Sequence, residues 1–326
     1  MQNSQNINTP LISFIVTYHN EPIQLLKECL DSIFELSLSD EEREIILVDD
    51  GSDESPLNEI VEYRDKINYL RQPHMGVCTG RNNGITLSSG TYLQFIDADD
   101  CLITNSYEHC LDIVRYKNPD MVLFNFTTEG TDVDTPYLFN GPLSGTEYMR
   151  HNNLKASVCS YIFRKKTLVD LRFTSGLEYG EDEEFTPQLI LRAENIYVTE
   201  TCAYYYRDRI ESVSHQTSSR AQVKQFSDAE HVILYLDHLA NTLPVDERTA
   251  LQRRVAQLTM DYIYNVIIKT HSEHQLNKRL EKLRGHGLFP LPDCDYTQKY
   301  KYFRKMINHK FGRKILLNTL PYISNK

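Results

Sequence analysis

Three continuous apolar runs in the first hundred residues constrain the fold of this chain more than any other feature. They read LISFIVTY (11–18), EIILVDD (44–50) and TYLQFIDADD (91–100). Each run is apolar along its length rather than at alternate positions, which is typical of strands covered on both faces. Helical patterns at 22–36 and 76–89 separate the runs. Strands that alternate with helices predict an α/β fold with a mostly parallel central sheet.

Each of these runs ends in a group of mostly polar residues, at 17–21, 49–53 and 97–100. In parallel sheets, ligands bind outside the carboxyl ends of the strands. The polar endings therefore predict one binding site at a single edge of the sheet. Further strands are expected at 120–126, 157–163 and 196–206, and a helix at 185–194.

The tetrapeptide DADD places Asp97, Asp99 and Asp100 together at the end of the third run. Asp97 and Asp99 can reach a common point, where a hard divalent cation would offset their repulsion and bind a diphosphate. Taken alone, the tetrapeptide is equally typical of a solvated loop in which Asp99 or Asp100 caps the next helix.

Beyond this local pattern, the order of four motifs resembles that of a known protein family. FIVTYHNE, ILVDDGSD, RNNGI and FIDADD follow one another in the first hundred residues. This set resembles the family 2 glycosyltransferases, over roughly the first 210 residues. The resemblance implies a GT-A fold, a nucleotide-binding αβα sandwich whose DxD motif holds Mn²⁺ or Mg²⁺ against the donor diphosphate. The DxD here is Asp97–Ala98–Asp99, with Asp99 favoured for direct metal contact.

The same resemblance implies roles for the other strand ends. The residues expected to bind the nucleotide are Thr17, Tyr18, Glu21, Asp49, Asp50, Arg81 and Asp97. The first three would hold the base and ribose, one of the two consecutive aspartates would accept the uracil N–H, and Arg81 would face the diphosphate or the acidic cluster. Tyr18 could instead be an ordinary half-buried strand residue, and DDGSD could be an ordinary turn. Arg81 could instead form a surface ion pair.

A second acidic cluster, at 181–184, precedes the helix expected at 185–194. Acids in a first helical turn interact favourably with the helix dipole, so a well-capped helix is the plain interpretation. Family members carry a Glu-Asp pair here, which implies Asp182 as the catalytic base and Glu181 as its neighbour or an acceptor contact. Arg207 or Arg209 would close over the diphosphate with His215 nearby, the alternative being an exposed salt bridge.

The composition and the apolar pattern of the sequence change near residue 215. Two long amphipathic patterns, 220–243 and 246–271, follow, and the tail from 299 to 326 is basic and contains no acid. We therefore expect a glycosyltransferase domain at 1–215 and a helical region at 216–326. The tail is expected either to pack on the protein or to touch a membrane surface through five apolar residues. These are Phe303, Met306, Phe311, Ile315 and Leu316.

The net charge, the apolar stretches and the cysteines limit which class of partner and which cellular location we expect. The formal net charge of −10 argues against a nucleic-acid partner gripped by overall basicity. No apolar stretch is long enough to span a bilayer, the first ten residues lack the pattern of a signal peptide, and the seven cysteines form no CxxC pair. We expect a cytoplasmic protein, with a peripheral position on the inner face of the plasma membrane as the option that the tail suggests.

The resemblance, taken with the acidic clusters, implies an inverting, metal-dependent glycosyltransferase. It would use a nucleotide-sugar, with a UDP-sugar favoured, and act on a glycan or lipid-linked acceptor in cell-surface polysaccharide synthesis. The family often has a tryptophan in the acceptor region and this chain has none, so the acceptor stays open. The alternatives are a catalytically silent nucleotide-sugar-binding subunit of a synthase complex, or a sugar-phosphate nucleotidyltransferase. The latter would need a glycine-rich, lysine-bearing phosphate loop, which TYHNEPIQ does not supply.

Overall fold

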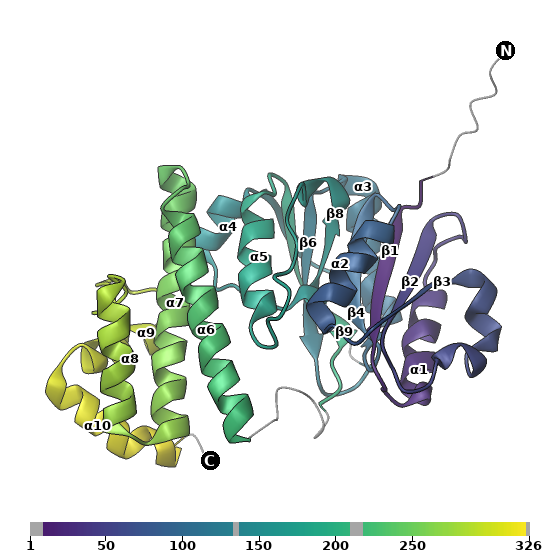
Figure 1. Ribbon diagram of the computed structural model, residues 1–326. Coiled ribbons are helices and arrows are strands. Elements are labelled where there is room, and N and C mark those ends of the chain that lie inside the picture. Colours follow the sequence, from purple (N-terminus) through teal and green to yellow (C-terminus); the bar gives the residue numbers. More distant parts are fainter. Residues whose placement is uncertain (1–8, 133–136, 209–217, 324–326) are drawn as a thin grey trace. The chain divides into compact units, whose positions relative to one another are not determined.

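The computed structural model describes residues 9–132, 137–208 and 218–323 (Figure 1). The chain divides into two compact units, one formed by Met1–Tyr148 with Lys155–Gln216 and the other by Met149–Leu154 with Thr217–Lys326. The short segment Met149–Leu154 thus groups with the C-terminal residues. The division into functional domains at 1–215 and 216–326 stays a prediction.

The strands of the first unit form a nine-stranded sheet within the described residues. They are β1 (Ile12–Tyr18), β2 (Arg43–Asp50), β3 (Asn68–Gln72), β4 (Tyr92–Asp97), β5 (Cys101–Leu102), β6 (Met121–Thr127), β7 (Phe139–Leu143), β8 (Tyr161–Arg164) and β9 (Ile196–Tyr205). Their order is β3-β2-β1-β4-β8-β6-β9-β5, and β7 pairs with β9.

Helices connect and cover the strands. Those of the first unit are α1 (Ile23–Phe34), α2 (Val77–Leu87), α3 (Thr104–Lys117), α4 (Gly145–His151, which reaches into Met149–Leu154) and α5 (Glu181–Leu191). Short 3₁₀ turns lie at η1 (Pro56–Asn58), η2 (Val61–Lys66), η3 (Val158–Ser160) and η4 (Lys165–Thr167). In Figure 1, α2 lies in front of β1 and α3 lies behind the sheet.

The four strands β3, β2, β1 and β4 are parallel to one another, and β8 joins the sheet antiparallel to β4. This confirms the expected α/β class. The neighbouring strands β1 and β2 are almost wholly buried, with Phe14, Ile15 and Ile46 fully shielded from solvent. Burial of such side chains stabilises the fold by about 1.5–3 kcal/mol each.

Three strands were not expected from the sequence, and each is either very short or without a buried apolar run. Strand β3 lies at one end of the strand order and is mostly half-exposed or exposed, β5 has two residues, and β7 pairs with β9 outside the main strand order. The helix predicted at 185–194 instead begins at Glu181, directly after Gly180 in the left-handed region.

The second unit is helical. Its helices are α6 (Ser219–Ala240), α7 (Val245–Thr270), α8 (Glu273–Gly285), α9 (Gln298–Ile307) and α10 (Lys310–Ile323). Apolar faces of α6 and α7 pack through residues such as Leu236 and Ile263, both almost fully buried. In the described part of the chain, no helix is both long and apolar enough to cross a membrane.

The tail differs from the expectation in its apolar face. Phe303 and Leu316 are 6% and 4% exposed, because they pack inside the helical unit. Phe311 and Ile315 do face solvent. The apolar face expected from the sequence is therefore split between the interior of the unit and its surface.

Candidate functional site

The carboxyl ends of β2, β1 and β4 lie side by side, because β1 pairs in parallel with both neighbours. In this register Tyr18 lies opposite Asp49, and Thr17 lies opposite Asp97. Residues from three separate motifs thus meet at one edge of the sheet. This is the position at which open parallel sheets bind their ligands.

The centre of the site is Arg81, which α2 delivers to the end of β4. One terminal nitrogen, Nη2, lies 3.1 Å from Asp97 Oδ1. The other, Nη1, lies 3.1 Å from Glu181 Oε1 and 3.0 Å from Asp182 Oδ1. The Arg81 side chain is only 4% exposed. Burial lowers the pKa of the guanidinium, but the three carboxylates outweigh it and the pKa is held well above its usual value.

This network joins the two acidic clusters that were singled out in the sequence. Asp97 also accepts a hydrogen bond from Thr17 Oγ1 (3.4 Å), and Cys159 Sγ lies 3.5 Å from its other oxygen. Asp182 accepts a second hydrogen bond, from the Val158 N–H at 3.2 Å. Arg81 is therefore a buried ion-pair partner and not a surface one.

The environment of Asp182 suits a proton acceptor. Burial and the neighbouring charge of Glu181 raise its pKa well above the usual range, and Arg81 opposes this rise. The Asp182 side chain keeps 23% of its surface exposed. A carboxylate that is reachable, oriented and more basic than usual can take a proton from a hydroxyl group.

The Asp97–Asp99 pair fits a hard divalent cation by its donor set and its surroundings. The Asp97 side chain is 32% exposed and Asp99 is half-buried. Burial raises the pKa of Glu21 to about 7, and the charges of Asp99 and Asp97 add to the rise. Burial followed by the charge of Asp97 also raises the pKa of Asp100, to about 8. A doubly charged ion with oxygen ligands would relieve this concentration of acids.

Asp100 itself is structural. Its carboxylate accepts hydrogen bonds from Tyr204 Oη (2.7 Å) and from the Arg207 N–H (2.8 Å). It therefore fastens the end of β9 to the end of β4 and does not cap the following helix.

The residues at the end of β1 are held tightly. The Tyr18 side chain is buried and its hydroxyl donates to the Glu21 carbonyl at 3.0 Å. The Glu21 carboxylate accepts from the His19 N–H. Thr17, Tyr18 and Glu21 are thus together at this edge, and their expected contacts with base and ribose stay a prediction.

The two aspartates that end β2 are both engaged by the protein. Asp49 is fully buried and accepts from the Ser52 N–H (2.8 Å) and Tyr69 Oη (2.7 Å). Asp50, at 5% exposure, accepts from Gln72 and from the backbone N–H groups that follow β3. Both aspartates are already bonded to protein groups, and which of the two contacts the nucleotide base stays a prediction.

Arg207 lies elsewhere in the site region. It forms an ion pair with Glu28 of α1 and lies over the Tyr205 ring, with its centre 5.3 Å from the ring. The structure does not bring it to Asp97 or Asp182 through any described ion pair. Arg209 and His215 lie outside the described residues.

Sequence reasoning missed two histidines at this edge. The rings of His19 and His74 stack with their centres 4.1 Å apart, beside Asp50. His19 sits within the TYHNE motif and could have been noticed. His74 lies in the loop after the unexpected strand β3, so no local signal pointed to it.

The comparisons with known proteins agree with this arrangement. Residues 13–171 match the family described as Glycosyl transferase family 2. The uncharacterized glycosyltransferase EpsJ of Bacillus subtilis (strain 168) is 29% identical over 221 residues, which are 63% of this chain and 63% of EpsJ. The minor teichoic acid biosynthesis protein GgaB of the same organism is 24% identical over 279 residues, 82% of this chain and 30% of GgaB. The chain therefore covers less than two thirds of the length of these relatives.

Solved structures share the fold. The crystal structure of Staphylococcus aureus TarS 1-349 in complex with UDP-GlcNAc is 18% identical with a TM-score of 0.56, over 93% of this chain and 92% of that one. The mannosyltransferase PcManGT of Pyrobaculum calidifontis, in complex with GDP-Man and Mn²⁺, is 12% identical with a TM-score of 0.56, over 97% and 88%. The expected GT-A fold is confirmed. The sequence match to glycosyl transferase family 2 therefore covers residues 13–171 of this chain, and the likeness to the solved structures shows that the fold is shared.

Proposed function

We propose that this protein is an inverting, metal-dependent glycosyltransferase of cell-surface polysaccharide synthesis. It moves a sugar from a nucleoside diphosphate sugar, with a UDP-sugar favoured, to a glycan or lipid-linked acceptor. One observation carries the proposal: a single buried guanidinium holds the expected metal ligand Asp97 on one nitrogen and the expected base Asp182 on the other.

The donor assignment rests on the strand-end site. Asp97 and Asp99 would hold Mn²⁺ or Mg²⁺, which supplies positive charge to the departing diphosphate. Arg81 maintains the Asp97 carboxylate in position through its 3.1 Å ion pair. UDP-GlcNAc in TarS supports a UDP-sugar, while GDP-Man in PcManGT requires that guanosine donors be tested as well.

The acceptor assignment rests on Asp182. Inversion requires a base that takes the acceptor proton on the sugar face opposite the leaving diphosphate. Asp182 is fixed from two sides, by Arg81 at 3.0 Å and the Val158 N–H at 3.2 Å, so its carboxylate is preorganised for this role. Its raised pKa makes it a stronger proton acceptor than an exposed aspartate.

The decisive experiment compares donor binding with turnover. Purified protein is incubated with a panel of UDP- and GDP-sugars with and without Mn²⁺, and release of nucleoside diphosphate is measured alongside thermal shift. We expect Asp182→Asn to bind the donor normally and to lose about 10²–10⁴-fold in turnover. Asp112→Asn, on the outer helix α3, is the matched control and should behave as wild type.

Unchanged turnover in Asp182→Asn would remove the base assignment. Donor binding without turnover in the wild type, over the whole panel, would favour the catalytically silent subunit. No response to any nucleotide-sugar would refute the proposal.

We also propose that α10 contacts an anionic membrane surface, which suits an acceptor carried on a lipid. Phe311, Ile315 and Tyr322 are exposed and their spacing places them on one face of the helix. Lys310 and Lys314 flank them, and within the described residues no acidic side chain pairs with either lysine. Basic and aromatic side chains on one helical face are typical of contact with anionic headgroups.

A further inference from the structure

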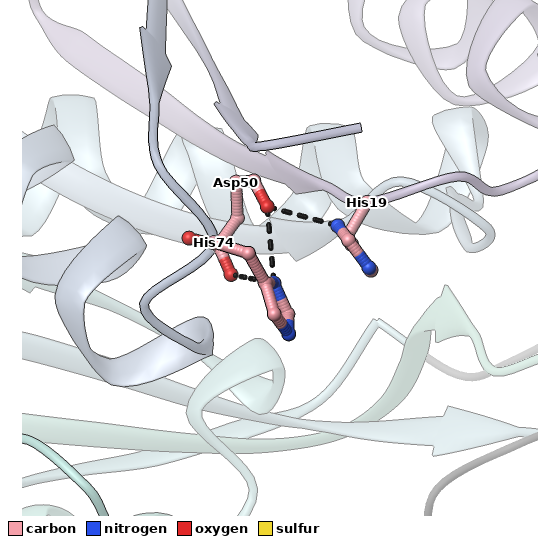
Figure 2. A group of neighbouring side chains, drawn as sticks. All are labelled: His19, Asp50 and His74. Atoms are coloured by element: carbon pink, nitrogen blue, oxygen red, sulfur yellow. Dashed lines mark hydrogen bonds and ion pairs between the residues drawn. The ribbon is translucent and has the colours of Figure 1, made fainter. Parts of the chain in front are cut away.

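Two histidine rings at the edge of the sheet are held in one tautomer by a common acceptor (Figure 2). His19 Nδ1 lies 2.8 Å from the backbone oxygen of Asp50, and His74 Nδ1 lies 3.1 Å from the same oxygen. His74 Nδ1 also lies 2.9 Å from the Asp50 carboxylate. Carbonyl and carboxylate oxygens only accept hydrogen bonds, so each Nδ1 carries the proton.

On a neutral ring with the proton at Nδ1, the other ring nitrogen, Nε2, keeps its lone pair. Histidines that bind metals through Nε2 typically donate their Nδ1–H to a backbone carbonyl or a carboxylate, which orients the ring and raises its basicity. His19 and His74 share this feature although they come from different motifs. Figure 2 shows both Nε2 atoms on the side of the rings that faces away from Asp50.

The acceptor that orients the rings is itself immobilised. Asp50 Oδ1 accepts from Gln72 Nε2 (2.6 Å) and from the Met75 N–H (2.8 Å), and Oδ2 accepts from the Gly76 N–H (2.8 Å). Asp50 also ends a buried strand. The rings therefore lie on a rigid support, stacked with their planes 20° apart.

We infer that His19 and His74 form a binding site for a divalent transition-metal ion such as Zn²⁺, with Asp50 as the residue that positions both rings. A ring nitrogen of each histidine and a carboxylate oxygen of Asp50 lie within 4.8 Å of one another, and the ring centres are 4.1 Å apart, so the two imidazoles can share an ion once one ring turns. The His74 side chain is 61% exposed, so solvent ions reach the site and this ring has room to turn toward an ion. Two imidazole nitrogens leave the remaining positions of a tetrahedral ion open to exchangeable ligands.

This site differs in chemistry from the Asp97–Asp99 pair. Imidazole nitrogen prefers Zn²⁺, Ni²⁺ or Cu²⁺, whereas carboxylate oxygen suits Mg²⁺ and Mn²⁺. The site lies at the same edge as the proposed donor site, but its test uses the protein without nucleotide, so the result does not depend on whether sugar transfer occurs.

The test uses the chain of 326 residues with any affinity tag removed, and measures Zn²⁺ binding by isothermal titration calorimetry. His19→Gln and His74→Gln should each weaken binding by at least tenfold, because each removes one of two ligands. His274→Gln, an exposed histidine of α8, should bind as wild type. Mg²⁺ titrated in place of Zn²⁺ should show no dependence on either histidine.

A second measurement reads the tautomers directly and does not rely on the variants. Long-range ¹H–¹⁵N spectra of the metal-free protein at neutral pH should show His19 and His74 protonated at Nδ1, and Zn²⁺ should shift their Nε2 signals. The inference is overturned if both variants bind Zn²⁺ with wild-type affinity, or if the ion leaves both Nε2 signals unchanged.

Discussion

At the scale of single residues, Arg81 is one cation surrounded by three carboxylates. Its side chain is 4% exposed, and it contacts Asp97, Glu181 and Asp182 at 3.0–3.1 Å. Removal of one partner from a buried ion pair is strongly destabilising, because it leaves the other charge uncompensated. Arg81 is therefore needed for stability as well as for placing the two proposed catalytic carboxylates.

Arg81→Met should lower the free energy of unfolding by about 3–5 kcal/mol at neutral pH. The loss should shrink at pH 5, because carboxylates that have lost their cation take up protons more readily in the folded state. Urea unfolding at pH 5 and pH 8 measures both effects. Arg81→Lys keeps the charge and should lose less, although its ammonium cannot reproduce the forked contacts. An equal loss at both pH values would contradict this explanation.

Glu21 should make stability depend on pH in the opposite direction from an ordinary salt-bridged acid. Burial raises its pKa from 4.5 to about 7 in the folded protein. Between these values the folded state binds more protons than the unfolded state, so the free energy of unfolding falls as pH rises from 4.5 to 7. The contribution of Glu21 to this fall is at most about 3 kcal/mol.

Glu21→Gln should therefore be more stable than wild type above pH 7, and its advantage should vanish toward pH 4.5. Chemical unfolding over this range, in buffer with a chelator, gives the difference between the two curves. Glu41→Gln, at an exposed position, is the control. Parallel curves for wild type and Glu21→Gln would show that the carboxyl group is not proton-linked to folding.

At the scale of elements, the close approach of α2 to the sheet is what brings Arg81 to the end of β4. A Cβ atom on Gly84 would lie 2.2 Å from Ile15 Cγ2 and 3.3 Å from Ile15 Cβ. Ile15 is fully buried on β1 and has no room to move away. The absence of a side chain at position 84 therefore sets the distance between helix and strand.

Gly84→Ala should destabilise the protein by about 1–3 kcal/mol, the usual cost of an overpacked core. This loss appears even though alanine favours a helix over glycine by about 1 kcal/mol. Gly285→Ala in α8 is the matched control, since a Cβ atom at that position would have no neighbour within 4 Å and the change should be neutral or stabilising. Denaturant unfolding of both variants provides the comparison, and a stable Gly84→Ala protein would refute the packing argument.

At the scale of the whole molecule, the two compact units carry different proposed tasks. The first unit holds the strand-end site, and the second presents the exposed face of α10. The α10 surface is basic although the protein has a formal net charge of −10. Attraction to a membrane would therefore depend on this local surface and not on overall charge.

The protein should sediment with vesicles rich in phosphatidylglycerol and not with phosphatidylcholine vesicles, and salt should weaken the binding. Phe311→Ser combined with Ile315→Ser should abolish most of it, and each of Lys310→Gln and Lys314→Gln should cost about 1 kcal/mol. Tyr116→Ser, an equally exposed aromatic on α3, is the control. Binding that is unaffected by the α10 variants would remove the membrane proposal.

Which elements could be predicted from the sequence depends on whether short stretches of chain or distant neighbours hold them in place. The buried runs of β1, β2 and β4 could be recognised because local apolar patterning is sufficient to mark a strand covered on both faces. The strands β3 and β7 have no such pattern, because their neighbours in the sheet, and not their own apolar content, hold them in place. His74 could not be identified from the sequence for the same reason, because it lies in the loop that follows β3.

The sequence by itself determined the α/β class, the order of the family motifs and the chemical types of the residues at the strand ends, because these depend on short stretches of chain. Only the tertiary structure decided which side chains meet. Arg81 and Asp182 are 101 residues apart in the chain yet 3.0 Å apart in space. The tertiary structure also decided that Asp49 and Asp50 accept hydrogen bonds from neighbouring protein groups, and that Phe303 and Leu316 are internal. The physical reason is that hydrogen bonds, ion pairs and burial act over a few ångströms in the folded protein, whatever the separation along the chain.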